Sequence, residues 1–460
     1  LTIACYIRFD RRRSERWYYL ALLAFAAGLL SKTSTVVLPV VLWLVLWWRH
    51  GKIRKEDFIR TAPFFAMSLV MGLLTIYFQY ARAIDVVEVG LGGPVQRVIE
   101  AGWSLWFYLY KAIIPLNLTM VYPRWEASAS NPLAYVPLVA WITVMVVLWL
   151  KRRTWWGGPT FFTFAYVVVA LLPVLGFLDM SFMVYSKVSD HLAQLALLGV
   201  TTWLTVAGVT LCNKLEVSAQ YAAAVALLSC AVLTWQHVHD YRSAEAMWTD
   251  VIDHNPDAWV AYTSLGTLRL QQGKLEEAEQ LLRQGLSRKD NDAKTFLNLG
   301  NVVAKLGRED EAIRLYRQAL ALPRQADSVR AQVHNNLGGL LTDRDQHDEA
   351  QRHFEQALEF QPDYLKAHYN YARLLYLQQQ YEQALSHLHA AEQLNPDVPE
   401  VLSLSGETYL KLNRPHEALV KFNAVAKIEP DHAGTQEYLG RIHFSLGNPR
   451  EAVVHLSNAL

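Results

Sequence analysis

Residues 298–320 read NLGNVVAKLGREDEAIRLYRQAL, and this stretch predicts two helices that pack against each other. Gly300 and Ala312 stand twelve positions apart, and Tyr316 follows the alanine by four. Small side chains at the first two positions let the two helices approach closely. The large side chain then fills the space towards the neighbouring unit. The stretch therefore predicts one unit of a stacked helical array.

The same spacing recurs along the second half of the chain, where Gly266 and Gly300 are 34 positions apart. The glycine position is occupied by Gly266, Gly300, Gly338, Ala372, Gly406 and Gly440. The alanine position is occupied by Ala278, Ala312, Ala350, Ala384, Ala418 and Ala452, and the large position by Leu282, Tyr316, Phe354, Leu388, Phe422 and Leu456. One break of four extra residues falls near RQADSVRA (324–331). Self-similarity at a fixed period is typical of a solenoid.

This pattern closely resembles the tetratricopeptide repeat (TPR). Proline closes several second helices, because its fixed φ and missing N–H stop further winding. A half-unit precedes the array in YRSAEAMWTDVIDHNPD (241–257). We therefore expect residues 241–460 to form a TPR superhelix of a half-unit plus about six repeats, the last one incomplete. Such arrays bind a protein or peptide in a concave groove.

The first half of the chain has a different composition. Residues 1–240 hold 20 Lys and Arg against 12 Asp and Glu, whereas residues 241–460 hold 23 against 30. The whole chain is 52% hydrophobic, which is above the usual fraction for a soluble domain. We therefore expect a multi-span membrane domain over residues 1–240. The sequence has no strongly basic stripe of the kind that binds nucleic acid, so it does not indicate a nucleic-acid partner.

Five apolar runs have the length of a spanning helix, at residues 64–80, 133–150, 160–178, 192–212 and 218–238. The expected fold class is all-α, with a polytopic transmembrane helical domain followed by a TPR α-solenoid. The chain starts at LTIACYIRFDRRRSER (1–16), which is typical of the end of an earlier membrane helix, and it stops inside a helical pattern. We therefore expect an internal fragment.

The run at residues 18–48 is too long for one span and contains Lys32 at its centre. Basic residues crowd both flanks, and the positive-inside rule places both flanks in the cytoplasm. The run then forms a hairpin of two short helices with Lys32 at the tip, where an intramembrane lysine indicates a functional site. The alternative is one long tilted helix in which Lys32 reaches the interface or pairs with a carboxylate.

A second difficult run, residues 98–118, contains Glu100, Lys111 and Pro115. If it spans the membrane, the basic triplet at residues 151–153 falls outside, against the rule. If it lies in the interface, the triplet is cytoplasmic and the TPR array is extracytoplasmic. We favour the second arrangement.

Asp190 and His191 begin a span on the expected outer face, close to Lys187. They are candidates for the lining of an outer cavity, and the alternative is helix capping by Ser189 or Asp190. The sequence contains no P-loop, no HExxH motif and no zinc-spaced Cys/His set. We therefore expect no metal site.

Four segments carry a second resemblance: GLLSKTSTVVLP (28–39), YLYKAIIPLNLTMVYPRW (108–125), YSKVSDHLAQLALLG (185–199) and AEAMWTDVIDHNPDAWVAYTSLG (244–266). In this order, they resemble bacterial relatives of the transmembrane-and-TPR (TMTC) protein O-mannosyltransferases. The resemblance implies a GT-C-type glycosyltransferase in a bacterial inner membrane. Such an enzyme transfers a sugar from a polyprenyl-phosphate lipid on the extracytoplasmic face.

The resemblance also implies roles for individual residues. Lys32 is expected near the donor lipid phosphate, and Asp190 and His191 in the outer cavity. The family's catalytic acidic residue is expected before residue 1, and neither Asp85 nor Glu88 is given that role. No cofactor is evident, although a divalent cation bound with the lipid-linked donor fits the family. The alternative to this enzyme is a non-catalytic, membrane-anchored TPR scaffold, so the sequence leaves the question of enzymatic activity open.

Overall fold

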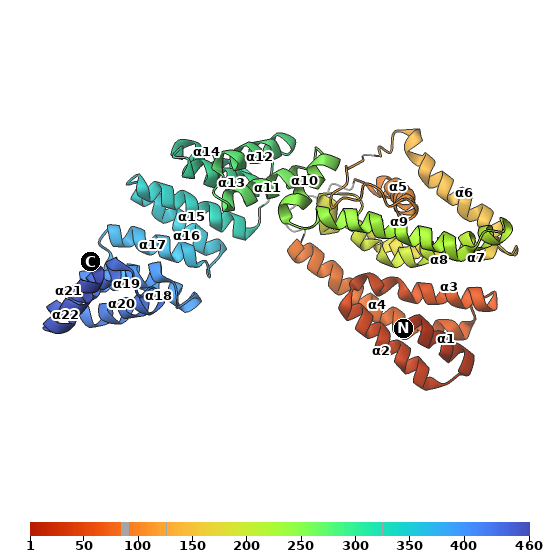
Figure 1. Ribbon diagram of the computed structural model, residues 1–460, viewed down its shortest axis with the longest axis horizontal. Coiled ribbons are helices and arrows are strands. Elements are labelled where there is room, and N and C mark those ends of the chain that lie inside the picture. Colours follow the sequence, from red (N-terminus) through yellow and green to blue (C-terminus); the bar gives the residue numbers. More distant parts are fainter. Residues whose placement is uncertain (84–91, 126, 324) are drawn as a thin grey trace. The chain divides into compact units, whose positions relative to one another are not determined.

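The computed structural model describes all residues except 84–91, 126 and 324, and the described part of the chain is built from helices without any β-strand (Figure 1). It divides into two compact units, Leu1–Leu265 and Gly266–Leu460. The division lies within helix α11 (Trp259–Gln271). The half-unit of the repeat pattern therefore makes its contacts within the first unit.

The first unit holds ten α-helices up to His254 in its described residues, and most of them are apolar. These are α1 (Thr2–Arg12), α2 (Glu15–Ser31), α3 (Leu38–His50), α4 (Lys55–Phe78), α5 (Pro94–Ile113), α6 (Val136–Leu150), α7 (Gly157–Leu171), α8 (Gln194–Lys214), α9 (Ala219–Asp240) and α10 (Ala244–His254). Among the described residues, six helical segments are long and apolar enough to cross a membrane, and each of the five predicted runs falls on one of them. Helix α9 has no buried residue at all.

The run at residues 18–48 folds as a hairpin. Helix α2 ends at Ser31, Lys32 has extended backbone angles, and a 3-10 turn (Thr33–Val37) leads into α3. At the far end, Arg49 and His50 of α3 both pair with Asp10 of α1. The end of α3 thus returns to α1, the helix that leads into α2, while Lys32 lies at the opposite end of both hairpin helices. The predicted hairpin is confirmed, and the single long helix is wrong.

Helix α5 covers most of the second difficult run. It is amphipathic, with Glu100 and Tyr108 among its buried residues, and it packs against α6 and α8. It is not one of the six segments long and apolar enough to span. This agrees with the interfacial arrangement that we favoured from the sequence, and the depth of α5 in a membrane stays a prediction.

The second unit is a stack of helix pairs. Its helices are α12 (Leu275–Arg288), α13 (Ala293–Lys305), α14 (Glu309–Ala321), α15 (Asp327–Asp343), α16 (His347–Phe360), α17 (Leu365–Leu377), α18 (Tyr381–Leu394), α19 (Pro399–Lys411), α20 (Pro415–Ile428), α21 (Ala433–Ser445) and α22 (Pro449–Ala459). A Cβ atom added to Gly300 would lie 2.4 Å from the ring of Tyr316, and one on Gly406 would lie 2.7 Å from Phe422. The predicted close approach at the glycine position is confirmed.

The four extra residues of the register break become one additional helical turn. Helix α15 has 17 residues, whereas the first helices α13 and α17 on either side have 13. Four residues are close to the 3.6 residues of one α-helical turn, so the pairing of α15 with α16 keeps its register. The repeat tolerates the insertion because the added turn extends one end of the helix.

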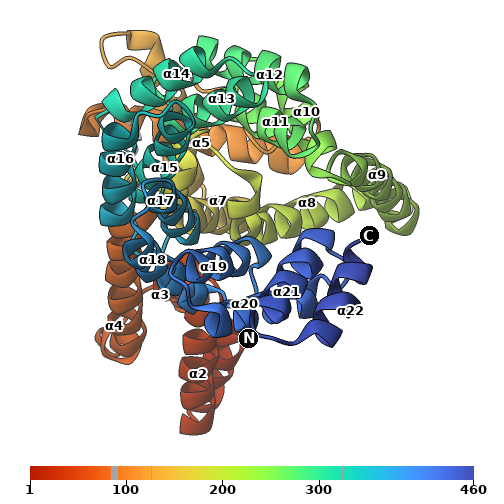
Figure 2. The ribbon, with the colours of Figure 1, turned by 90° about the vertical axis from the view of Figure 1, so that its left-hand side faces the viewer.

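First helices of successive pairs contact one another, as α13 contacts α15, α15 contacts α17 and α17 contacts α19. The helices of this unit follow one another around a curve in Figure 2. First helices therefore form the inner side of the curve, which is the side where TPR solenoids present their binding surface.

Candidate functional site around Asp190 and the 115–118 loop

Lys32 reaches the segment that contains the other predicted site residues. Its Nζ donates a hydrogen bond to Oε1 of Gln194 at 2.9 Å. Gln194 is the first residue of α8, and the short turn Asp190–Leu192 lies just before it. The tip of the hairpin and the Asp190 segment are therefore neighbours, although 162 sequence positions separate the two bonded residues.

Asp190 is held by a tyrosine from a distant loop. Its Oδ2 accepts a hydrogen bond of 2.5 Å from the hydroxyl of Tyr122. Burial, together with the hydrogen bond that Tyr122 donates to this carboxylate, raises the pKa of Tyr122 well above its usual range. The phenol therefore stays protonated and acts as the donor, as a charge-assisted hydrogen bond requires.

The capping alternative does not describe Asp190. Ser189 stands at the N-cap position of the Asp190–Leu192 turn, as the capping alternative has it for this residue, whereas helix α8 has Ala193 at its N-cap. His191 lies in the same turn, but its side chain is outside the described part of the structure. Its predicted place in the cavity stays a prediction.

Tyr108 fixes the same turn from α5. Its hydroxyl accepts a hydrogen bond from the backbone N–H of Ser189 at 2.9 Å and donates one to the carbonyl of the same residue at 3.4 Å. The side chain is buried. Two tyrosines from separate segments thus hold the backbone and the carboxylate of the Asp190 turn.

In the sequence, Lys111 is only a charge that disfavours a spanning helix. In the structure its Nζ donates to the carbonyls of Leu116 and Asn117, at 2.6 and 2.9 Å. The same ammonium lies 5.3 Å from the centre of the Tyr122 ring. Lys111 therefore closes the loop that follows α5 and lies against the tyrosine that holds Asp190. A lysine at the end of an aromatic helix was the available signal for this role.

A buried ion pair fixes the segment of the chain that leads to Asp190. Nζ of Lys187 lies 2.8 Å from Oε2 of Glu100, and both side chains are only 6% exposed. The sequence placed Lys187 near Asp190 but gave no partner for it. A buried pair of this kind fixes geometry, because separating the charges would leave each one uncompensated.

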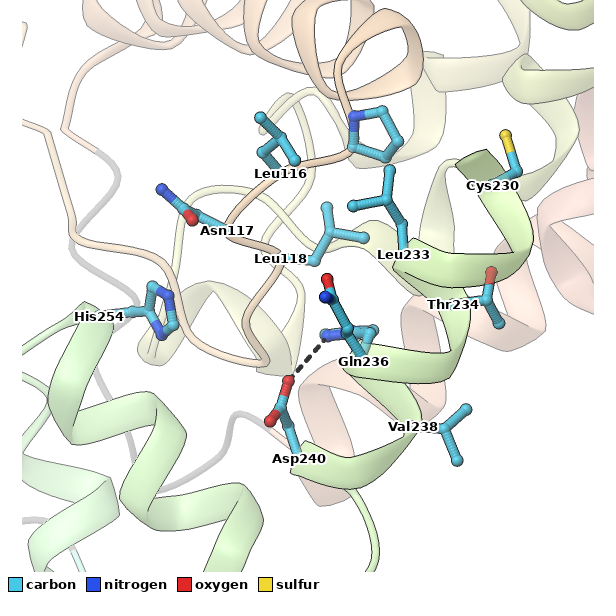
Figure 3. Close-up of a pocket in the computed structure, with 12 residues that line it drawn as sticks. Leu116, Asn117, Leu118, Cys230, Leu233, Thr234, Gln236, Val238, Asp240 and His254 are labelled. Carbon is cyan, nitrogen blue, oxygen red and sulfur yellow. Dashed lines mark ion pairs between the residues drawn. The ribbon is translucent and has the colours of Figure 1, made fainter. Parts of the chain in front are cut away.

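A cavity of about 370 Å³ lies against the loop that follows α5. Residues 115–118 form one wall, the last turns of α9 form another, and His254 contributes from α10 (Figure 3). Leu116, Leu118 and Leu233 gather on one side, while Gln236 and Asp240 lie on the other. His237 and Asp240 form an ion pair of 3.4 Å in the polar part.

Metal-ligating side chains do not gather in this region. Among the residues that the structure describes, no three or more His, Cys, Asp or Glu side chains form a group that could hold an ion. The described residues thus supply an ammonium, Lys32, bonded to the segment of a tyrosine-bound carboxylate, Asp190, and a partly apolar cavity that neither of these two residues lines.

Comparison with known proteins gives matches to the repeats and to one glycosyltransferase. Models of the tetratricopeptide repeat match residues 291–363, and residues 238–299 with 341–408. The chain is 29% identical over 160 residues to "Protein O-mannosyl-transferase Tmtc3" of Drosophila melanogaster, covering 32% of this chain and 17% of that protein. It is 30% identical over 116 residues to "Tetratricopeptide repeat-containing protein trd-1" of Caenorhabditis elegans, covering 25% of this chain and 12% of that protein. The chain therefore contains tetratricopeptide repeats and spans a small part of both relatives.

Solved structures resemble part of the chain in fold. PilF of Pseudomonas aeruginosa has a TM-score of 0.39 at 23% identity, covering 43% of this chain and 88% of its own. PilW, a type IV pilus biogenesis factor, has a TM-score of 0.39 at 22% identity, covering 43% of this chain and 90% of its own.

Proposed function

We propose that this protein is a membrane glycosyltransferase of GT-C type in a bacterial inner membrane. It takes a sugar from a polyprenyl-phosphate lipid and transfers it, on the extracytoplasmic side, to a protein held by the TPR array. The observation that carries the proposal is the hydrogen bond from Lys32 to Gln194, which sets an ammonium beside the Asp190 segment. The partial similarity to a protein O-mannosyl-transferase supports the same reading.

Lys32 suits the phosphate of such a donor. An ammonium is a point-charge ligand for phosphate oxygens. A hairpin tip within the apolar region brings that charge to the depth at which a lipid phosphate enters from the membrane surface. Gln194 fixes the direction of the long lysine side chain, which lowers the entropy lost when a phosphate binds.

The neighbouring cavity suits a sugar. Asn117, Gln236 and Asp240 offer amide and carboxylate groups that bind hydroxyls, and the leucines on the opposite side offer an apolar surface. A divalent cation is expected to arrive with the lipid-linked donor, since no three or more His, Cys, Asp or Glu side chains of the described residues form a group that could hold one. The role of this chain is to bind and orient the donor.

The alternative function is a membrane-anchored TPR scaffold without catalysis. The repeat models match only the array and its lead-in, and TPR arrays generally bind protein or peptide partners. Under this alternative, the inner side of the curve holds a partner while Lys32 and Asp190 only stabilise the helices that carry them.

The two functions separate in one experiment. The full-length protein is reconstituted in liposomes with a polyprenyl-phosphate mannose labelled on the sugar, together with periplasmic proteins as acceptors. Label transferred to protein supports the enzyme. Proteins retained by the array without any transfer, across mannose, glucose and galactose donors, support the scaffold and contradict the enzyme.

A further inference from the structure

Two histidine pairs occupy equivalent places in consecutive repeats. Nδ1 of His334 on α15 lies 2.9 Å from Nδ1 of His353 on α16. One repeat later, Nδ1 of His368 on α17 lies 3.0 Å from Nδ1 of His387 on α18. Each pair joins the first helix of a repeat to the second. The preceding repeat has Phe296 and Leu315 at these positions, and the following one has Leu402 and Lys421.

A contact between two Nδ1 atoms needs one donor and one acceptor. In the second pair, Nε2 of His368 faces the carbonyl of Pro362 at 3.0 Å, so this nitrogen carries a proton. When His368 is neutral, its Nδ1 is therefore the acceptor and Nδ1 of His387 is the donor. One added proton on the free nitrogen of His387 leaves the hydrogen bond in place. A second proton would go to Nδ1 of His368. The N–H groups of both Nδ1 atoms would then point at each other, and two positively charged rings would be in contact.

We propose that these two pairs make the segment α15–α18 a pH-sensitive part of the array, which loosens on acidification while the histidine-free repeat α13–α14 keeps its packing. The consequence is a joint within the binding solenoid that opens while the preceding repeat keeps its packing. This inference does not depend on the proposed transfer activity.

The direction of the effect follows from burial. Burial, with His353 beside it, lowers the pKa of His334 to about 4, and burial with His368 beside it lowers that of His387 to about 4. A histidine with a lower pKa in the folded state takes up its proton mainly in the unfolded state. Stability is then complete above about pH 6.5 and is lost as the pH falls towards about 4.

Charged neighbours do not cancel this effect in the first pair. Arg330, Arg317 and Arg352 all lower the pKa of its histidines, and Glu349 is the carboxylate that raises the pKa of His353. In the second pair, Glu355 raises the pKa of His387 and the ring of Tyr371 lies 4.4 Å from its ring. Among the described residues, each pair therefore has a single carboxylate, Glu349 or Glu355, which offsets one positive charge and leaves the second one uncompensated.

Hydrogen exchange read by mass spectrometry tests the proposal on the full-length protein in detergent micelles. Protection factors, corrected for the intrinsic rate at each pH, are compared at pH 7.5 and pH 5.0. We expect α15–α18 to lose protection by roughly ten-fold or more relative to α13–α14. Equal losses in the two segments would overturn the proposal.

The matched variant replaces one histidine of each pair by asparagine, as His334→Asn with His387→Asn. An amide can keep the hydrogen bond but does not titrate between these pH values. The pH-dependent loss in α15–α18 should then disappear. If it persists at the wild-type size, the pairs are not its origin. Should the double variant already be loose at pH 7.5, each single variant is measured instead, and each should remove the loss from its own repeat only.

Discussion

Lys32 donates a hydrogen bond to Gln194 at 2.9 Å, and this bond joins the tip of the α2–α3 hairpin to the first turn of α8. Asp190, four residues before Gln194, accepts a hydrogen bond from the hydroxyl of Tyr122. An ammonium from one segment and a carboxylate from another are thus assembled around a single short turn. Replacing Gln194 by leucine should remove this hydrogen bond while leaving the hairpin, which the contacts of Asp10 hold at its other end.

Tyr122→Phe should destabilise the first unit. It removes a hydrogen bond to the Asp190 carboxylate, and such charge-assisted bonds contribute about 1.5–3 kcal/mol. The measurement is thermal unfolding in detergent, followed by tryptophan fluorescence. Tyr135→Phe is the matched control, because Tyr135 donates only to an exposed backbone carbonyl. Equal unfolding temperatures for the two variants would show that the Asp190 contact contributes little.

The buried pair of Lys187 and Glu100 predicts a non-additive result. Lys187→Met leaves a buried carboxylate without its partner and should lower the free energy of unfolding by about 3–5 kcal/mol. The double variant with Glu100→Leu should lose less than either single variant, because neither charge then remains. A double-mutant cycle in denaturant measures the coupling. A double loss equal to the sum of the single losses would contradict a direct pair.

Two adjacent glycines of α15 predict opposite effects. A Cβ at Gly338 would lie 2.9 Å from the ring of Phe354, whereas a Cβ at Gly339 would meet no atom within 4 Å. Gly338→Ala should destabilise the array by about 1–3 kcal/mol through overpacking. Gly339→Ala should stabilise it by about 0.5–1 kcal/mol through helix propensity. Chemical unfolding measures both, and a shared sign would refute the packing assigned to the repeat.

The proposed orientation predicts the location of two reporter fusions. Alkaline phosphatase, which is active outside the cytoplasm, should be active after residue 245 and inactive at Lys52, in the basic loop after α3. A fluorescent reporter that matures in the cytoplasm should give the reverse result. Fluorescence after residue 245 would place the array in the cytoplasm and remove the proposed route to an extracytoplasmic acceptor.

The repeats were predictable because their packing is local and periodic. Gly300 meets Tyr316 sixteen positions away, within one helix pair, and the same contact recurs in unit after unit. The hairpin was predictable from charge, because basic residues before α2 and after α3 require both ends on one side. In both features, a pattern that is visible in the sequence alone, periodic spacing or flanking charge, determines the structure.

The site was only partly predictable. Lys32 and Asp190 could be selected as candidates, since a charged residue in an apolar segment is costly without a role. Their partners Gln194 and Tyr122 could not, because 162 and 68 sequence positions separate the bonded residues. Which helices of a membrane domain pack together is not encoded in a periodic pattern, since lipid-facing and protein-facing surfaces are both apolar.

The proposed role of Lys32 is to bind the phosphate of a lipid-linked sugar for transfer. The rate of sugar transfer in liposomes, by the full-length protein and its Lys32→Met variant, tests this role. Lys52→Met, in the basic loop after α3, is the matched control. We expect transfer to fall by about 10²-fold or more in Lys32→Met, with Lys52→Met unchanged and Lys32→Arg retaining part of the activity. Equal transfer by Lys32→Met and Lys52→Met, at equal amounts of folded protein, would contradict the assignment.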